Sequence, residues 1–319
     1  MWLSGLVEFA AAEQVFARVG QVTISDSSLW RRVKKWGERF KTLETLGQAV
    51  ATALPHRTDL IPGEKRGAGE MGVALDGATV NIRQEGWKEL KVGSVFQITQ
   101  RPTWDTKLAE WVDQAHAVQN SYVAHLGGPE RLGQLVWTEA LRRGWTQAGD
   151  TIVLGDGADW IWNQANDHFY DSRQAVDWYH ATQHLWKAAH VLYGDGTPEA
   201  QQWYHTQDTP LFEGQADQVA FGLRALAHTH PKQTEELHRE AGYFENHVRR
   251  MQYQELREDG WPIGSGMVES ACKQYRHRFV GAGMRWSRPG IERLLPVRSA
   301  ILSRRFDELW SAAYKPPLN

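Results

Sequence analysis

The chain has 319 residues, a net charge of −2, and 41% hydrophobic and 23% charged residues, which is a globular composition for two or three structural units. No apolar run approaches the roughly 18 residues that a membrane helix needs, and the N-terminus lacks the pattern of a signal peptide, so we expect a cytoplasmic protein with no membrane partner. The single cysteine, Cys272, excludes an intrachain disulfide and a cysteine-based zinc finger.

The first 55 residues have the outline of a helix-turn-helix. Residues 6–19 suit a short helix that Gly20 ends, and Ser25-Asp26 is a good N-cap pair for a second helix that continues into the forties. The second helix is basic in its first turns, at Arg31, Arg32, Lys34 and Lys35. The pattern favours a DNA-binding segment over residues 1–55, with a solvated basic helix face as the alternative. Residues 56–70 are rich in Pro, Gly and charge and indicate a linker.

Short extended segments follow the linker. The pattern predicts strands at Met71–Asp76, Ala78–Arg83 and Leu90–Ile98, which favour an antiparallel meander. A mixed helical stretch is expected from there to Asp150, with a helix near Pro129–Arg143.

A buried strand is predicted at Thr151–Gly155, with Asp156 at its carboxyl end and a helix from Ala158. A further strand is expected at residues 174–177, followed by a helix from Trp178 and a polar, helical stretch to about Gly260. Three last helices are predicted at Ser265–Phe279, Arg288–Leu302 and Arg305–Ala313.

Charge is unevenly distributed along the second half of the chain. Trp178–Gly260 has 7 Lys and Arg against 12 Asp and Glu, and holds 8 of the 13 histidines. From Trp261 to the end there are 10 Lys and Arg against 4 Asp and Glu. The C-terminal part therefore offers the local basic face that phosphate binding needs, whatever the overall charge.

Three acidic residues are candidates for metal binding. Asp76 and Asp156 each follow an apolar strand and precede a glycine, which lets a metal or phosphate come close, although Asp-Gly also occurs in ordinary turns. Glu269 falls in the first turns of a helix with Lys273 and Arg276 on the same face, which is also the pattern of a surface salt-bridge row. Two aspartates and a glutamate suit Mg²⁺ or Mn²⁺, and two such ions can clamp the attacking and leaving oxygens of a phosphodiester.

Five segments in this order resemble one known family. They are Asp76-Gly77-Ala78, Glu85-Gly86-Trp87-Lys88-Glu89-Leu90-Lys91-Val92-Gly93, Leu154-Gly155-Asp156-Gly157-Ala158-Asp159-Trp160-Ile161-Trp162, Asp177-Trp178-Tyr179-His180 and Gly264-Ser265-Gly266-Met267-Val268-Glu269-Ser270. Together they are similar to the Kra-type bacterial insertion-sequence transposases, within the broad DDE group related to mutator-like and hAT-like transposases. The resemblance covers roughly Met71 to Trp310.

The resemblance implies an α/β fold: a ribonuclease H-like mixed sheet flanked by helices and interrupted by an all-α insertion domain. The core is expected at residues 71–180 and 261–319 and the insertion at 181–260. It implies Asp76 on the first strand, Asp156 after the fourth strand and Glu269 on a late helix as the catalytic metal ligands. Together they are expected to hold two Mg²⁺ or Mn²⁺ ions. Asp177 and His180 are expected beside the metal ligands or at DNA, with a structural helix-start histidine as the alternative.

The function implied is cleavage of a phosphodiester at transposon ends and strand transfer into target DNA. Synapsis of two ends suggests a homodimer or larger assembly on the DNA of the bacterial nucleoid. Five basic residues of the C-terminal part are expected to hold phosphates of double-stranded DNA: Lys273, Arg276, Arg278, Arg285 and Arg288.

Two other interpretations remain. Longer family members carry a cysteine-rich segment ahead of the helix-turn-helix, which this sequence lacks, so a truncated or non-catalytic transposase-derived DNA-binding protein is the first. A glycosidase that uses two carboxylates is the second, since the 16 tryptophans would suit sugar stacking. The basic C-terminal helices argue against the glycosidase.

Overall fold

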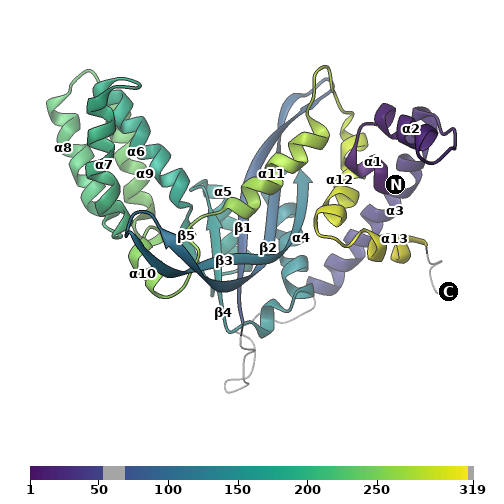
Figure 1. The fold of residues 1–319 in the computed structure, drawn as a ribbon, viewed down its shortest axis with the longest axis horizontal. Helices are drawn as coiled ribbons and strands as arrows, with labels where there is room; N and C mark the ends of the chain where they lie inside the picture. Colours follow the sequence, from purple (N-terminus) through teal and green to yellow (C-terminus); the bar gives the residue numbers. More distant parts are fainter. Residues whose placement is uncertain (53–68, 315–319) are drawn as a thin grey trace.

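The computed structural model describes residues 1–52 and 69–314 and has a mixed α/β fold (Figure 1). A central sheet lies between a helical arm on one side and the N- and C-terminal helices on the other. The sheet has the strands β1 (Glu70–Ile82), β2 (Gly86–Asp105), β3 (Glu110–Leu126), β4 (Asp150–Gly155) and β5 (Arg173–Val176). The α-helices are α1 (Trp2–Leu6), α2 (Phe9–Arg18), α3 (Asp26–Thr52), α4 (Pro129–Arg142), α5 (Asp159–His168), α6 (Trp178–Tyr193), α7 (Pro198–Phe212), α8 (Ala216–Thr229), α9 (Thr234–His247), α10 (Tyr253–Glu258), α11 (Gly266–Phe279), α12 (Arg288–Leu302) and α13 (Phe306–Tyr314).

The sheet has the order β3-β2-β1-β4-β5 and combines two kinds of pairing. β1 pairs antiparallel with β2, and β2 pairs antiparallel with β3. On the other side, β1 pairs parallel with β4, and β4 with β5. β4 and β5 therefore end side by side, close to the point where the pairing of β1 with β4 ends, while β1 continues along β2. Open α/β sheets build their binding sites at the carboxyl ends of their parallel strands.

The strands differ from the sequence prediction in two ways. The segments expected at Met71–Asp76 and Ala78–Arg83 are one continuous strand, because β2 pairs with β1 past Asp76 and Gly77. The stretch expected to be mixed helical before α4 is instead the far part of β2 and all of β3. That part of the hairpin is mostly polar and half-exposed to exposed, so it lacks the apolar alternation that identifies a strand.

Helices cover both faces of the sheet. Gly93 of β2 lies so close to Val136 of α4 that an added Cβ would meet its Cγ2 at 2.3 Å, so α4 packs tightly on this face. α11 packs on β1 and β2 from the face of Asp76, and α12 packs against β3 and α3. The predicted helices near 129–143, at 265–279 and at 288–302 are confirmed, with Ser265 as the residue before α11.

The stretch 181–260 is helical, as predicted. α6, α7, α8 and α9 run side by side as an arm that extends away from the sheet (Figure 1), and the short α10 lies at its base. Trp186 of α6 stacks on Tyr204 of α7, with ring centroids 4.1 Å apart and an interplanar angle of 11°. This pair contributes to the packing between the two helices.

The N-terminal segment forms three helices. The helix expected at 6–19 corresponds to α2, and α1 is a separate short helix before it that was not predicted. α3 starts where predicted: the Ser25 hydroxyl accepts a hydrogen bond of 3.3 Å from the Ser28 N–H. α3 packs along α12, α4 and α13, so the segment is joined to the core. Most of the predicted linker, 56–70, lies outside the described residues, and Glu70 already belongs to β1.

Candidate metal centre beside an aspartate row

Three aspartates lie just past the last paired residues of the parallel part of the sheet. Ala74 of β1 pairs with Leu154 of β4, and Asp76 and Asp156 each come two residues later. Gly155 of β4 pairs with Val176 of β5, and Asp156 and Asp177 each come next. Because matched positions on adjacent parallel strands face the same side, the register aligns Asp76, Asp156 and Asp177, which we call the aspartate row.

Asp76 and Asp156 are held differently within the row. The prediction that Asp156 follows the end of its strand is confirmed, and its Oδ1 accepts a hydrogen bond of 2.9 Å from the Ala158 N–H. The prediction that Asp76 ends a strand is wrong, because its pairing with Val92 of β2 keeps it inside β1. Asp76 is nevertheless past the last parallel pair of β1 with β4, so its carboxylate stands at the open edge of that pairing.

Asp177 is buried and fixes two segments at once. Its Oδ1 accepts a hydrogen bond of 2.8 Å from the His180 N–H, so it caps the N-terminus of α6. Its Oδ2 accepts a hydrogen bond from the Ser265 N–H, just before α11. The side chain of Ser265 makes no capping hydrogen bond to α11, and its carbonyl accepts hydrogen bonds from the N–H groups of Val268 and Glu269.

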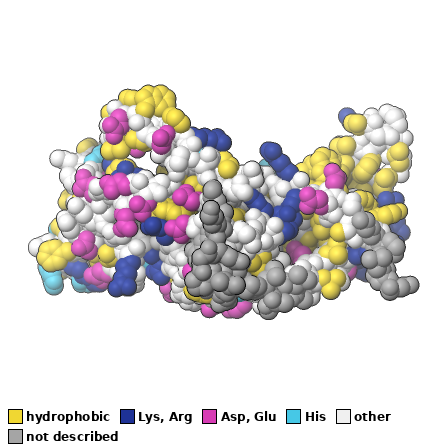
Figure 2. Space-filling view, turned by 90° about the horizontal axis from the view of Figure 1, so that it is seen from below, with side chains coloured by type: hydrophobic (Ala, Val, Ile, Leu, Met, Phe, Trp, Pro, Cys, Tyr) yellow, Lys and Arg dark blue, Asp and Glu magenta, His cyan; other side chains and the backbone are white. Residues whose placement is uncertain are grey.

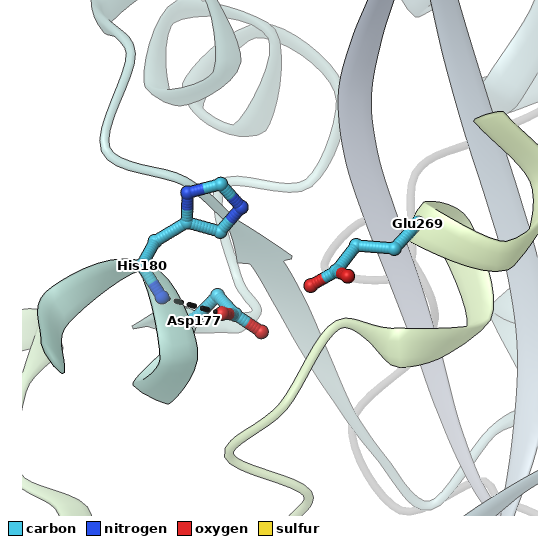
Figure 3. Close-up of side chains that lie close together, drawn as sticks. All are labelled: Asp177, His180 and Glu269. Carbon is cyan, nitrogen blue, oxygen red and sulfur yellow. Dashed lines mark hydrogen bonds between the residues drawn. The ribbon is translucent and has the colours of Figure 1, made fainter. Parts of the chain in front are cut away.

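Glu269, in the first turns of α11, meets the residues at the start of α6. One ligand atom each of Asp177, His180 and Glu269 lie within 4.8 Å of one another, and Figure 3 shows the Glu269 carboxylate pointing toward the other two from the opposite side. Among the residues that the structure describes, this is the group with the spacing of a metal site. Asp76 and Asp156 are outside that group, so Glu269 shares this spacing with Asp177 and His180 rather than with the two acids predicted as its fellow ligands.

Electrostatics couple the row to this group. Burial raises the pKa of Asp76 above its usual range; hydrogen bonds from the Gly77 N–H, at 2.6 Å, and from the Cys272 thiol oppose the rise, and the charge of Asp156 adds to it. The neighbouring His180 lowers the pKa of Asp76. A half-buried pair of carboxylates favours either protonation or a bound cation.

Tyr243 reaches the site from the arm, a residue that the sequence analysis did not identify. Its hydroxyl donates a hydrogen bond of 3.0 Å to the carbonyl of Asp156. His184 stacks on the Tyr243 ring at 3.5 Å, and its Nδ1 lies 2.6 Å from the Glu240 carboxylate. Gly157, at φ +101°, leaves room for the ring, since an added Cβ would meet it at 2.7 Å.

The predicted phosphate-binding residues have different surroundings. Lys273, Arg276 and Arg285 are exposed, as are Arg31, Arg32, Lys34 and Lys35 of α3. Arg288 is half-exposed and forms an ion pair with Glu85.

The prediction that Arg278 binds a phosphate is wrong, because its side chain is buried. It is 1% exposed and donates two hydrogen bonds, of 3.0 and 2.8 Å, to the Ser4 carbonyl, so it holds the N-terminal helices rather than a phosphate. Helical periodicity places Arg278 two residues beyond Arg276 and therefore on another face of α11.

Figure 2 shows the molecule from below, with the acidic side chains of this face gathered mainly on the left, where the arm lies in Figure 1.

Comparison of the sequence with protein-family models and with curated proteins found no match. None of the described helices has the length and apolar character to cross a membrane.

Proposed function

We propose that this protein is a metal-dependent DNA transposase with a ribonuclease H-like core. It would hydrolyse a phosphodiester at a transposon end, and the freed 3′-hydroxyl would attack a phosphodiester of the target DNA, which joins the two strands and releases a 3′-hydroxyl of the target. The observation that carries the proposal is the alignment of Asp76 and Asp156, each two residues past the last parallel pair of β1 with β4, with Glu269 on α11, which packs on β1. The family that the sequence resembles has its acids on the first strand, after the fourth strand and on a late helix, which agrees with β1, β4 and α11.

The donor set fits hard divalent cations. Asp76, Asp156 and Glu269 supply carboxylate oxygens, the ligands that Mg²⁺ and Mn²⁺ prefer. The raised pKa of Asp76, caused first by burial and increased by Asp156, fits a position whose ionised form needs a counter-charge. When bound, two such ions neutralise negative charge on the attacking and leaving oxygens of the phosphodiester.

The protein's own residues would bind and orient the DNA. Lys273 and Arg276 project from α11, the helix of Glu269, and Arg285 and Arg288 follow it in the chain. These cations suit the phosphates next to the scissile bond, and α3 with Arg31, Arg32, Lys34 and Lys35 suits a more distant stretch of double-stranded DNA. A homodimer or larger assembly on the bacterial nucleoid would hold two transposon ends together.

The test is Asp156→Asn in a cleavage assay. The substrate is DNA that carries the inverted repeats flanking the gene, with Mg²⁺ or Mn²⁺, and Asp167→Asn on the exposed side of α5 is the control. We expect Asp156→Asn to bind the DNA as the unchanged protein does and to lose strand cleavage by at least about 100-fold, since one lost electrostatic group costs about that much. Cleavage by Asp156→Asn at the normal rate contradicts the assignment.

A non-catalytic DNA-binding protein is the alternative outcome. It predicts salt-dependent binding to the repeats without strand cleavage by the unchanged protein with either ion. Salt-dependent binding is common to both functions, so cleavage of matched ends is the measurement that separates them.

A further inference from the structure

The group of Asp177, His180 and Glu269 differs in chemistry from the carboxylates of the proposed catalytic site. It combines one imidazole with two carboxylates, brought from the end of β5, the first turn of α6 and the first turns of α11 (Figure 3). Oxygen-only sites suit Mg²⁺, whereas an imidazole nitrogen favours divalent transition ions. The ligand types therefore separate this group from the pair Asp76 and Asp156.

We propose that Asp177, His180 and Glu269 form a cation position of their own that prefers a divalent transition ion such as Mn²⁺ to Mg²⁺. Glu269 is then shared: it is a ligand of this position and, under the proposed function, also of the ions that Asp76 and Asp156 would hold. The inference deepens the proposed function and rests on it only for the role of the ion in DNA cleavage; ion binding itself is independent of DNA.

The spacing of the group is suitable for one ion. An octahedral ion with ligands at about 2.1 Å has neighbouring ligand atoms roughly 3 Å apart and opposite ones about 4.2 Å apart. The three ligand atoms lie within 4.8 Å of one another, so a small side-chain rotation brings them onto one ion. Lys273, whose Nζ is 3.9 Å from Glu269, has a side chain that is 79% exposed, so a cation can displace it without disturbing the core.

Asp177 is held in place before any ion binds. Its two oxygens accept hydrogen bonds from the backbone N–H groups of His180 and Ser265, which fix the carboxylate between α6 and α11. A carboxylate has about four acceptor positions, so these two bonds leave room for a metal. Such outer contacts orient metal ligands and strengthen binding.

A buried hydroxyl supplies an independent sign that the surroundings of Asp177 accommodate a polar ligand. Tyr253 has no exposed surface, and its hydroxyl has no hydrogen-bond partner among the described residues. The Tyr253 ring meets that of Trp178, the residue after Asp177, edge to face with centroids 5.0 Å apart, so Tyr253 lies next to the start of α6. Burial raises the pKa of its hydroxyl, and the charge of Asp177 adds to the rise. The interior beside Asp177 therefore has hydrogen-bonding capacity that no described group uses.

The experiment is a titration of the metal-free full chain with Mn²⁺, followed by the electron paramagnetic resonance signal of the free ion. The unchanged protein is compared with His180→Ala and with His180→Gln. Both variants remove the imidazole and keep the backbone N–H that donates a hydrogen bond to Asp177. His190→Ala, farther along α6, is the matched control. Circular dichroism and thermal unfolding establish that each variant is folded.

We expect the unchanged protein and His190→Ala to bind Mn²⁺ at a site from which Mg²⁺ displaces it only in more than about tenfold excess. Both His180 variants should bind Mn²⁺ at that site at least about tenfold more weakly. Unaltered Mn²⁺ affinity in the folded His180 variants overturns the inference, as does displacement by an equal concentration of Mg²⁺.

Failure of the cation position and failure of the proposed function give different results. Selective Mn²⁺ binding that depends on His180, in a protein that does not cleave matched DNA ends, supports the cation position and contradicts the transposase proposal. Cleavage that depends on Asp156, in a protein whose Mn²⁺ binding is indifferent to His180, supports the transposase proposal and overturns the cation position.

Discussion

Tyr243 of α9 donates a hydrogen bond of 3.0 Å to the main-chain carbonyl of Asp156, 87 residues earlier in the chain. The bond joins α9, the last long helix of the arm, to the loop that follows β4. Because Gly157 faces the same ring, the loop that carries Asp156 is positioned partly by the arm. The arm therefore has a structural connection to the candidate site, in addition to any contact that it makes with DNA.

Tyr243→Phe removes this bond and keeps the ring that stacks on His184. We expect the free energy of unfolding to fall by about 1 kcal/mol, the usual effect of one lost neutral hydrogen bond. Cleavage should slow by roughly tenfold, because the loop of Asp156 is less well fixed. Chemical denaturation and single-turnover cleavage measure the two effects. Tyr193→Phe, on the partly exposed end of α6, is the control, and equal cleavage by both variants contradicts a positioning role.

The carboxyl group of Asp76 gives a pH prediction. Burial and the charge of Asp156 raise its pKa in the folded protein, so between the ordinary aspartate pKa and the raised value the folded state binds more protons than the unfolded state. Stability must then fall as the pH rises through that window and stay lower above it. Asp76→Asn removes this titration, so without metal the stability of the variant should fall less as the pH rises. At neutral pH the variant should therefore be more stable than the unchanged protein.

Thermal unfolding from about pH 4 to pH 8, with chelator and then with Mg²⁺, measures this difference. Added Mg²⁺ should stabilise the unchanged protein more than Asp76→Asn, because an ion that binds only the folded state stabilises it. Parallel pH profiles for the two proteins would show that the environment of Asp76 is not the cause.

Part of this arrangement was predictable from the sequence and part was not. The apolar run before Asp156 and the helical periodicity of 288–302 identify β4 and α12 because each depends on local pattern. The far half of the β2–β3 hairpin was missed because it is stabilised by strand pairing and by docking at its tip rather than by an apolar face. Pro102 is tolerated within β2 because β2 pairs only with β3 beyond Gln97.

The same limit applies to the candidate site. Asp76, Asp156 and Glu269 were identifiable as acids next to glycines or cations, but their partners depend on strand register and on helix packing. The contact of Glu269 with Asp177 and His180 follows from the hydrogen bond of Asp177 with Ser265, 88 residues away. No pattern within a short window contains that information.

Arg276 and Arg278 of α11 are expected to have different roles, because Arg276 is exposed and available to DNA whereas Arg278 is buried and structural. Arg278→Met removes two charge-assisted hydrogen bonds to the Ser4 carbonyl and should lower the free energy of unfolding by about 2 kcal/mol. Arg276→Ala alters an exposed side chain and should change stability by less than about 0.5 kcal/mol.

DNA binding should show the reverse order. Arg276→Ala should weaken binding and reduce the slope of log affinity against log salt by about 1, as the loss of one phosphate contact does. Arg278→Met, at a temperature where it is folded, should keep the slope of the unchanged protein. Fluorescence anisotropy at several salt concentrations measures both variants, and an equal loss of slope for Arg278→Met would return this residue to the DNA-binding surface.

Lys107, at the tip of the β2–β3 hairpin, joins the sheet to the base of the arm. Its Nζ lies 2.6 Å from the Asp208 carboxylate of α7, and 4.4 and 5.3 Å from the ring centroids of Phe212 and Trp178. Trp178 directly follows Asp177, so the hairpin supports the segment that starts α6.

Lys107→Met keeps the apolar stem and removes the charge, which should cost about 1 kcal/mol for a partly exposed ion pair with aromatic contacts. The tip should then separate from the arm more often, so the backbone amides of residues 100–116 should exchange with deuterium faster, and those of β4 should not. Lys187→Met, on the exposed side of α6, should leave both rates unchanged. Unaltered exchange in the hairpin of Lys107→Met would mean that strand pairing alone holds the tip in place.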